Sequence, residues 1–173
     1  MAIFHLDFKI VKRSEGMTSV AKAAYHARTR ITDDRIGETF DFSHRTDLHG
    51  HIILAPVSAP SHIVVSSSAL WNEVERVERQ NNGQTARYFD VAIPVELSND
   101  DKKKLVAEYC QKNFVDKGMI ADIAFHDLDG KNPHAHVMLT LKTITAAGFG
   151  KKDRSWNDKK VMLQWRESWA TMS

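Results

Sequence analysis

Three of the nine histidines lie within one short segment of the chain. His126 precedes the turn-like stretch DLDGKNP, and His134 and His136 follow it in an otherwise apolar run. Side chains two apart in a strand share a face, so the pattern predicts a β-hairpin with all three imidazoles on one side. If His126 lies opposite His134, their α-carbons are about 4.5–5.5 Å apart, and His136 is about 6.6–7 Å further along the strand. The three rings can then converge on one point.

A trio of neutral imidazoles is a ligand set for a metal ion. Imidazole suits zinc, manganese, nickel, copper or iron, and a further carboxylate or phosphate oxygen admits manganese or magnesium. The single Cys110 permits no internal disulfide and supplies no thiolate cluster. We therefore expect nitrogen and oxygen ligands, and these ligands alone do not choose among the metals.

The same alternation in neighbouring strands places other polar side chains beside the histidines. In the strand expected at 87–93, alternation sends Phe89, Val91 and Ile93 to the core, which leaves Tyr88 and Asp90 on the opposite face. In the strand expected at 3–11, His5 and Asp7 fall on the polar face. Asp90 could orient an imidazole from outside the ligand shell or serve as a fourth ligand.

A metal ion with open positions acts as a Lewis acid and would serve a nucleophile. Of the three tyrosines, Tyr25 stands in the helix-like stretch KAAYHARTR, whose alanines permit close approach to a sheet. Lys22 and Arg28 bring positive charge to it, and nearby cations favour the nucleophilic phenolate. Tyr25 is the candidate nucleophile, although aromatic residues on helices usually pack in the core. Tyr88 could lie on the polar face, whereas Tyr109 belongs to an amphipathic helix.

The apolar period switches between two and about 3.6, which predicts an α+β domain. We expect an antiparallel sheet whose apolar face packs on helices and whose polar face holds the site. Besides the hairpin and the two strands above, the expected elements are a short strand at 51–54, helices at 17–30, 70–79 and 98–118, and a last helix carrying Trp165 and Trp169. The stretch 31–66 is expected to be rich in loops, and a flexible basic loop is expected before the last helix.

Length and composition bound the class of protein. A chain of 173 residues with 42% hydrophobic residues suits a single domain over 1–173, which we expect to be the N-terminal part of a longer protein. It has no apolar run of about 18 residues and no secretory signal, so we expect a cytoplasmic protein without membrane insertion. The net charge is +2, with basic residues crowded toward both ends, which weakly favours a polyanionic partner.

Four stretches together resemble a known family. NPHAHVMLT preceded by MIADIAFHD, with AAYHARTR near the N-terminus and WNDKKVMLQWRESWA at the end, is similar to the relaxase domain of the MobA/MobL conjugative mobilisation proteins, a branch of the histidine–hydrophobe–histidine (HUH) nucleases. The resemblance covers nearly the whole chain. It implies about five antiparallel strands with helices on one face and the metal site on the other, with Tyr25 as nucleophile and His126, His134 and His136 as metal ligands. The family often has two carboxylates in the segment ARYFDVAIP, where this chain keeps Asp90 and has Tyr88 in place of the first.

The resemblance implies a site- and strand-specific enzyme that nicks and rejoins DNA for plasmid mobilisation. Tyr25 would attack one phosphodiester of single-stranded DNA at a transfer origin, leaving a 5′-phosphotyrosyl link and a free 3′-hydroxyl. The base that takes the phenolic proton is open among His26, Asp90 and a metal-bound hydroxide. We expect magnesium or manganese, with zinc, nickel or another divalent ion as alternatives. The expected partners are the origin DNA, accessory relaxosome proteins and a conjugative coupling protein.

Basic residues are expected to follow the DNA backbone. The candidates are Lys22, Arg28, Lys142, Lys151, Lys152 and Arg154. Phe149 and Trp156 could stack on bases, whereas the alternative is a mobile charged loop with a core tryptophan.

Three other functions remain open at this point. A rolling-circle replication initiator or a transposase of the same superfamily would keep the fold and change the biology. A cupin-like oxygenase also has two histidines spaced two apart in a strand, but it needs more strands and has no use for Tyr25. A non-catalytic DNA-binding module would have structural histidines.

Overall fold

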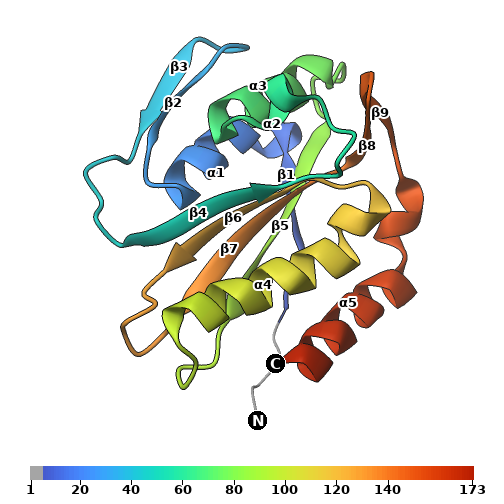
Figure 1. Cartoon of the computed structure of the whole chain (residues 1–173). Helices are drawn as coiled ribbons and strands as arrows, with labels where there is room; N and C mark the ends of the chain where they lie inside the picture. The colour runs from blue at the N-terminus through green and yellow to red at the C-terminus, as the bar shows by residue number, and fades with distance from the viewer. Residues whose placement is uncertain (1–5) are drawn as a thin grey trace.

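The computed structural model describes residues 6–173, and a five-stranded antiparallel sheet lies at its centre (Figure 1). Its spatial order is β1-β5-β7-β6-β4. The strands are β1 (Lys9–Lys12), β4 (Leu48–Leu54), β5 (Gln84–Ala92), β6 (Ala121–His126) and β7 (His134–Thr140). The expected α+β class and five-stranded sheet are confirmed. The expected strand 3–11 begins outside the described residues, as does His5.

Five α-helices flank the sheet. They are α1 (Ser19–His26), α2 (Ser61–Val64), α3 (Ser67–Val77), α4 (Asn99–Asn113) and α5 (Lys159–Met172). Four of them begin at a polar residue whose side-chain oxygen accepts a backbone N–H of the first turn; these caps are Thr18, Ser66, Ser98 and Asp158. Short 3-10 turns occupy Arg13–Glu15, Val115–Lys117 and Arg154–Asn157.

The odd-numbered positions of the hairpin form one wholly apolar face. Phe125, Val137 and their neighbours meet Phe89 and Val91 of β5 in a core that α4 and α5 cover. Aromatic rings fill the space between sheet and helices: Tyr109 of α4 packs edge-on against Trp169 of α5, with ring centroids 5.2 Å apart. This face matches the alternation of the sequence.

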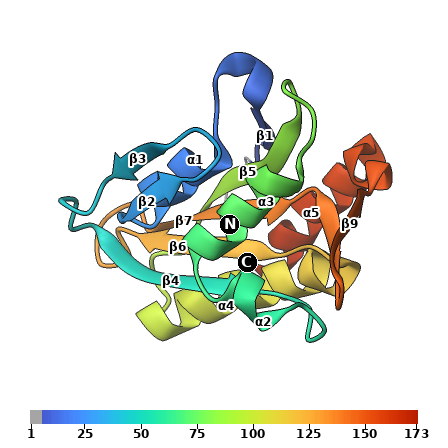
Figure 2. The same ribbon diagram turned by 90° about the horizontal axis from the view of Figure 1, so that it is seen from above.

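Helices pack on both faces of the sheet, which corrects the expectation that they lie on one face only (Figure 2). On the face opposite α4 and α5, α1 and α3 bury an apolar cluster around Trp71, Met138 and Ile120. The physical reason is that this face carries the cluster of histidines only at the end where β6 stops and β7 starts, and is largely apolar elsewhere, with Asp122 as a buried exception. The apolar side chains at its other end must be buried by helices, as those of the first face are.

Two regions expected to be loops contain hairpins. Within 31–66 lie β2 (Arg30–Asp33), β3 (Glu38–Asp41) and the start of β4, and β8 (Lys142–Thr145) pairs with β9 (Gly148–Lys152) in the expected basic loop. Both hairpins are short two-stranded ribbons in which few residues are fully buried. Their sequences therefore show little of the apolar alternation that predicts a strand.

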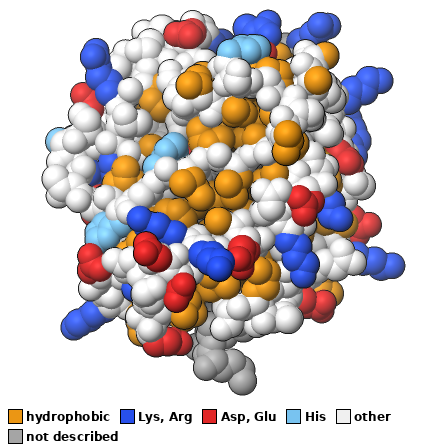
Figure 3. Space-filling model, in the orientation of Figure 1, with side chains coloured by type: hydrophobic (Ala, Val, Ile, Leu, Met, Phe, Trp, Pro, Cys, Tyr) orange, Lys and Arg blue, Asp and Glu red, His pale blue; other side chains and the backbone are white. Residues whose placement is uncertain are grey.

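β4 is an edge strand, bonded to β6 on one side only. Apolar side chains gather across the front of the molecule in the region of this strand (Figure 3). Within β4, the partly buried Ile52 and Leu54 pack against the core under α4 and α5. No helix within residues 6–173 has the length and apolar character needed to cross a membrane.

Candidate metal and nucleophile site

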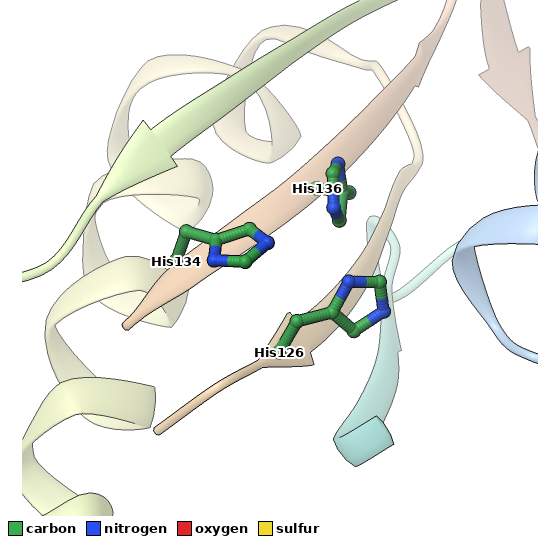
Figure 4. A group of neighbouring side chains, drawn as sticks. All are labelled: His126, His134 and His136. Carbon is green, nitrogen blue, oxygen red and sulfur yellow. The ribbon is translucent and has the colours of Figure 1, made fainter. Parts of the chain in front are cut away.

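His126, His134 and His136 rise from the same face of the β6–β7 hairpin toward a shared space (Figure 4). His126 is directly paired with His134 across the hairpin, as the spacing predicted. The ring centroids are 5.4 Å apart for His126 and His134, 4.5 Å for His126 and His136, and 4.9 Å for His134 and His136. One nitrogen from each ring lies within 4.8 Å of the other two. Small ring rotations bring such nitrogens to a common ion, since imidazole ligands bind zinc at about 2.0–2.1 Å.

The second nitrogen of each imidazole has a partner in the protein. His126 Nε2 lies 2.8 Å from the carbonyl oxygen of His26, and His134 Nδ1 lies 2.7 Å from that of Asn132. His136 Nδ1 contacts Asp90 Oδ1. Each partner accepts an N–H and so leaves the other ring nitrogen with a free lone pair, which is how metal-binding histidines are usually oriented. The residues therefore fit a metal ion, and Asp90 takes the orienting position that the sequence suggested for it.

The surroundings of His126 favour its neutral form, which metal binding requires. Burial is the main cause that lowers the pKa of His126 to about 4, and His136 and Arg28 add repulsion. Asp90 lies on the exposed side of the group. Burial alone would raise its pKa, but the hydrogen bond from His136 and the electrostatic interaction with the neighbouring histidines outweigh burial, so its pKa is lowered and it carries a negative charge.

His26 supports the trio from α1. Its ring stacks on that of His136, with centroids 4.5 Å apart and planes 21° from parallel. Burial holds its pKa well below the usual value, and its Nδ1 is buried without a hydrogen-bond partner. His26, Asp90 and His136 also form a second group whose ligand atoms lie within 4.8 Å of one another. His26 therefore belongs to the site, as a neighbour of the three histidines.

Tyr25 precedes His26 and is half-buried at the edge of the site. Its ring packs edge-on against Phe42, at 5.2 Å, and lies 6.1 Å from the ring of His26. The guanidinium carbons of Arg28 and Arg45 lie 4.6 and 5.2 Å from its ring centroid. Positive charge therefore surrounds the phenol, as the sequence predicted for Arg28. The positions of Arg45 and Phe42 beside Tyr25 could not be predicted, because the segment between β3 and β4 has no periodic pattern.

The other predicted DNA contacts lie in two places. Lys22 of α1 is close to the site, with Nζ 4.2 Å from the ring centroid of Tyr88 and a charge that interacts with Asp90. The remaining four lie on or just after the β8–β9 ribbon, at the far end of β7: Lys142, Lys151, Lys152 and Arg154. With Arg76, Arg79 and Phe149, they line a cavity of about 770 Å³.

The four basic side chains at the ribbon differ in their exposure and in their contacts with the rest of the protein. Lys142 Nζ donates to the carbonyl of Val77, and Lys152 forms a 2.5 Å ion pair with Glu78. Lys151 and Arg154 are exposed. Trp156, expected as a stacking candidate or a core residue, is buried in the core with α5. Phe149 is partly buried against the cluster under α3.

Asp122 lies on the same face as the histidines but is part of a buried network. It accepts hydrogen bonds from Ser67 Oγ at 2.6 Å and Trp71 Nε1 at 2.8 Å, and pairs with His51 Nε2 at 2.5 Å. Ser67 and Trp71 belong to α3, so the network fastens that helix to β6. The parity of a strand places a polar residue on a face but does not say whether it binds a ligand or a helix.

The chain is similar to proteins of plasmid transfer. The sequence model of the MobA/MobL family matches residues 17–173. The conjugal transfer protein TraA of Agrobacterium fabrum is 35% identical over 161 residues, which cover 88% of this chain and 14% of that protein. A probable mobilization protein MobA of Bifidobacterium longum is 31% identical over 83% of this chain and 26% of its own length. The chain thus spans less than half the length of these relatives.

A solved structure has the same fold. It comes from work on vancomycin resistance transfer in Staphylococcus aureus, has a TM-score of 0.91 and 29% sequence identity, and covers 99% of this chain and 90% of its own. The family match extends over nearly all of the chain, and TraA of A. fabrum is 35% identical to it over most of its length. This protein is therefore a member of the MobA/MobL family.

Proposed function

We propose that this chain is the nicking and joining unit of a conjugative relaxase of the HUH type, which cleaves single-stranded DNA at a plasmid transfer origin through Tyr25. One observation carries the proposal. Tyr25 and His26 are consecutive residues, and His26 contacts two members of the histidine trio while the ring of Tyr25 is close to two guanidinium groups. The helix thus brings a phenol with cationic neighbours next to a candidate metal-binding cluster. Relatives named for conjugal transfer and mobilisation support the same role.

The reaction exchanges one phosphodiester for another. The Tyr25 oxygen forms a bond to phosphorus while the bond from phosphorus to the 3′-oxygen breaks, and the electron pair leaves with that oxygen. The phenol loses one proton and the departing 3′-oxygen gains one. Because the tyrosyl ester keeps the energy of the broken bond, the 3′-hydroxyl can later attack it and restore the strand.

Each residue of the site has a distinct part in this scheme. His126, His134 and His136 would hold a divalent ion, with magnesium or manganese expected first. The positive charge of this ion would stabilise the negative charge on the non-bridging phosphate oxygens. Asp90 and the His26 carbonyl fix the orientation of two of these rings. Asp90 and the His26 ring both lie beside the histidine trio, so both are candidates to accept the proton of the Tyr25 phenol.

The basic cavity by the β8–β9 ribbon is proposed to bind the DNA backbone away from the reacting phosphate. Lys151 and Arg154 are exposed and free to contact phosphates, whereas Lys142 and Lys152 contribute charge from fixed positions. Lys22 would act near the site. The partners proposed for the whole protein are accessory relaxosome proteins and a coupling protein, and the place of action is the cytoplasm, where plasmid DNA lies.

The test is capture of a covalent adduct. The protein is incubated with Mn²⁺ and a random pool of single-stranded oligonucleotides labelled at the 3′ end, then denatured and run on a gel. Because the tyrosyl link holds the 5′-phosphate of the downstream fragment, the label stays with the protein, and sequencing of trapped fragments gives the cleavage site. Tyr25→Phe and EDTA should each abolish the adduct, whereas the matched control Tyr88→Phe should retain it. An adduct that survives Tyr25→Phe, or wild-type protein that forms none, contradicts the proposal.

A further inference from the structure

Arg28 occupies a backbone position that ordinarily belongs to glycine. After α1, the N–H of Thr29 bonds to the carbonyl of Ala24 and the N–H of Arg28 to that of Tyr25, which together form a Schellman motif. The residue that ends this motif must be left-handed, and Arg28 has φ +50°. Side chains other than glycine and asparagine are strained there. A strained arginine persists where its side chain has a use that glycine cannot supply.

The Arg28 side chain is held in one place. Nε and Nη2 donate to the two carboxylate oxygens of Asp47 at 2.8 and 3.0 Å, and Nη1 donates to the carbonyl of Tyr25 at 2.7 Å. The side chain is only 5% exposed, whereas that of Asp47 is 52% exposed. Paired hydrogen bonds of this type fix the plane of the guanidinium as well as its position. Asp47 directly precedes Leu48, which pairs with His126, so this clamp is tied to the metal-binding hairpin.

The hydrogen bonds to Asp47 place the Arg28 guanidinium next to both Tyr25 and His126. Its carbon lies 4.6 Å from the Tyr25 ring centroid, and Nη2 lies 3.5 Å from His126 Nδ1. That nitrogen is the one left with a lone pair by the contact of His126 Nε2 with His26. The lone pair can accept a hydrogen bond from the Arg28 N–H or bind a metal ion, but not both. When it serves a metal, the N–H must find another acceptor nearby.

We infer that Arg28 is a further catalytic residue of the proposed reaction, and that it donates to a non-bridging oxygen of the phosphate that Tyr25 attacks. Asp47 is its positioning residue. A phosphate between the phenol and the histidines supplies the acceptor that the freed N–H needs, and negative charge on that phosphate grows as the new bond forms. A fixed donor at such a point stabilises the transition state without having to reorganise. Arg28 transfers no proton, so the balance of the reaction above is unchanged. This inference rests on the proposed function.

The experiment compares Arg28→Gly and Arg28→Lys with wild type. In Arg28→Gly the strain at the left-handed position is removed, so the midpoint of thermal unfolding should stay within a few degrees of wild type or rise. The rate of adduct formation on the trapped cleavage sequence should fall about 10²–10³-fold in both variants, the usual loss for one such donor. Asp47→Asn should lose about tenfold and recover part of this loss at saturating DNA. Arg30→Lys, at an exposed arginine of β2, is the matched control and should react as wild type does.

Mn²⁺ binding, followed by calorimetry without DNA, gives a readout independent of activity. Removal of the competing N–H and its charge should raise the affinity of Arg28→Gly for Mn²⁺ several-fold. If Arg28→Gly forms adduct at the wild-type rate, or binds Mn²⁺ more weakly than wild type, the inference is wrong while the role of Tyr25 stands. If wild-type protein forms no adduct at all, the proposed function itself fails, and this outcome is distinct from the first two.

Discussion

On the face covered by α4 and α5, the strands present mainly apolar side chains, with Arg87 of β5 buried against Trp165 as an exception. On the opposite face, one half of the same strands is apolar core and the other half is polar. One end of that second face is core under α3, and the other end carries the histidines. The first face is fixed mainly by packing, with a few buried hydrogen bonds such as that from the Tyr109 hydroxyl to the carbonyl of Trp165. The second is fixed by hydrogen bonds and ion pairs that tie α1 and α3 to the sheet, such as those of His126 and Asp122. The difference indicates that the first face supplies most of the stability and the second face holds reactive groups in place.

The largest effect on stability is expected from a substitution that creates a cavity in the face covered by α4 and α5. Trp169 is 1% exposed and packs against Tyr109. Trp169→Ala should reduce the free energy of unfolding by about 3–5 kcal/mol, the range for large aromatic truncations in a core. Leu163→Ala, in the same helix at a residue 52% exposed, should change it by less than about 0.5 kcal/mol. Urea denaturation followed by tryptophan fluorescence for Leu163→Ala, and by circular dichroism for both variants, measures these changes. Equal effects would contradict the assignment of stability to this face.

An intermediate effect is expected where the second face is held by a buried polar network. Asp122→Ala leaves Ser67 Oγ and Trp71 Nε1 without their acceptor, and an unsatisfied buried donor costs about 1–3 kcal/mol. The free energy of unfolding should therefore fall by about 2–4 kcal/mol in urea titrations. Asp129→Ala, at an exposed aspartate of the hairpin turn, is the control and should be neutral. A neutral Asp122→Ala would mean that the network adds nothing to the attachment of α3.

The smallest effect on the fold is expected at the metal-binding end. His134 is half-buried, and within residues 6–173 its ring forms a hydrogen bond to the carbonyl of Asn132 alone. With EDTA present, His134→Ala should change the free energy of unfolding by no more than about 0.5 kcal/mol. With Mn²⁺ at a hundred times its dissociation constant, wild type should gain about 2.7 kcal/mol, and the variant should gain much less. The exposed His62→Ala serves as control. If the variant and wild type gain equally, the trio does not bind the ion.

Much of this plan could be predicted from alternation alone. The register of His126 with His134, the core positions Phe89 and Val91 of β5 and the place of Asp90 on the face of the histidines all follow from the period of two in the strands. The contact of Asp90 with His136 in particular depends on the pairing of β5 with β7, which alternation does not predict. The existence of α4 and its start at Ser98 follow from capping and period. These features are local, or they connect strands that are adjacent in the sheet, so the sequence carries them directly.

What could not be predicted depends on contacts between distant segments. Nothing in the pattern around Asp47 links it to Arg28, because the segment before β4 is a loop and the pair meets only after α1 docks on the sheet. The burial of one end of the second face by α3 could not be predicted either. A polar residue such as Asp122 gives the same sequence pattern whether its side chain contacts a ligand or a helix. Arg28 itself was predicted as a DNA contact, but its left-handed backbone was not.

Because Tyr25 and His26 are neighbours near the end of a single helix, they move together as a rigid body. The start of that helix is anchored by Glu75, which accepts from both the N–H and the hydroxyl of Ser19. One residue inserted between Ser19 and Tyr25 would turn both side chains by about 100° about the helix axis. It would misplace the phenol and withdraw the carbonyl from His126 in the same event. Changes of target sequence during evolution must therefore be sought in the ribbons and loops around the centre, where insertions leave this helix undisturbed.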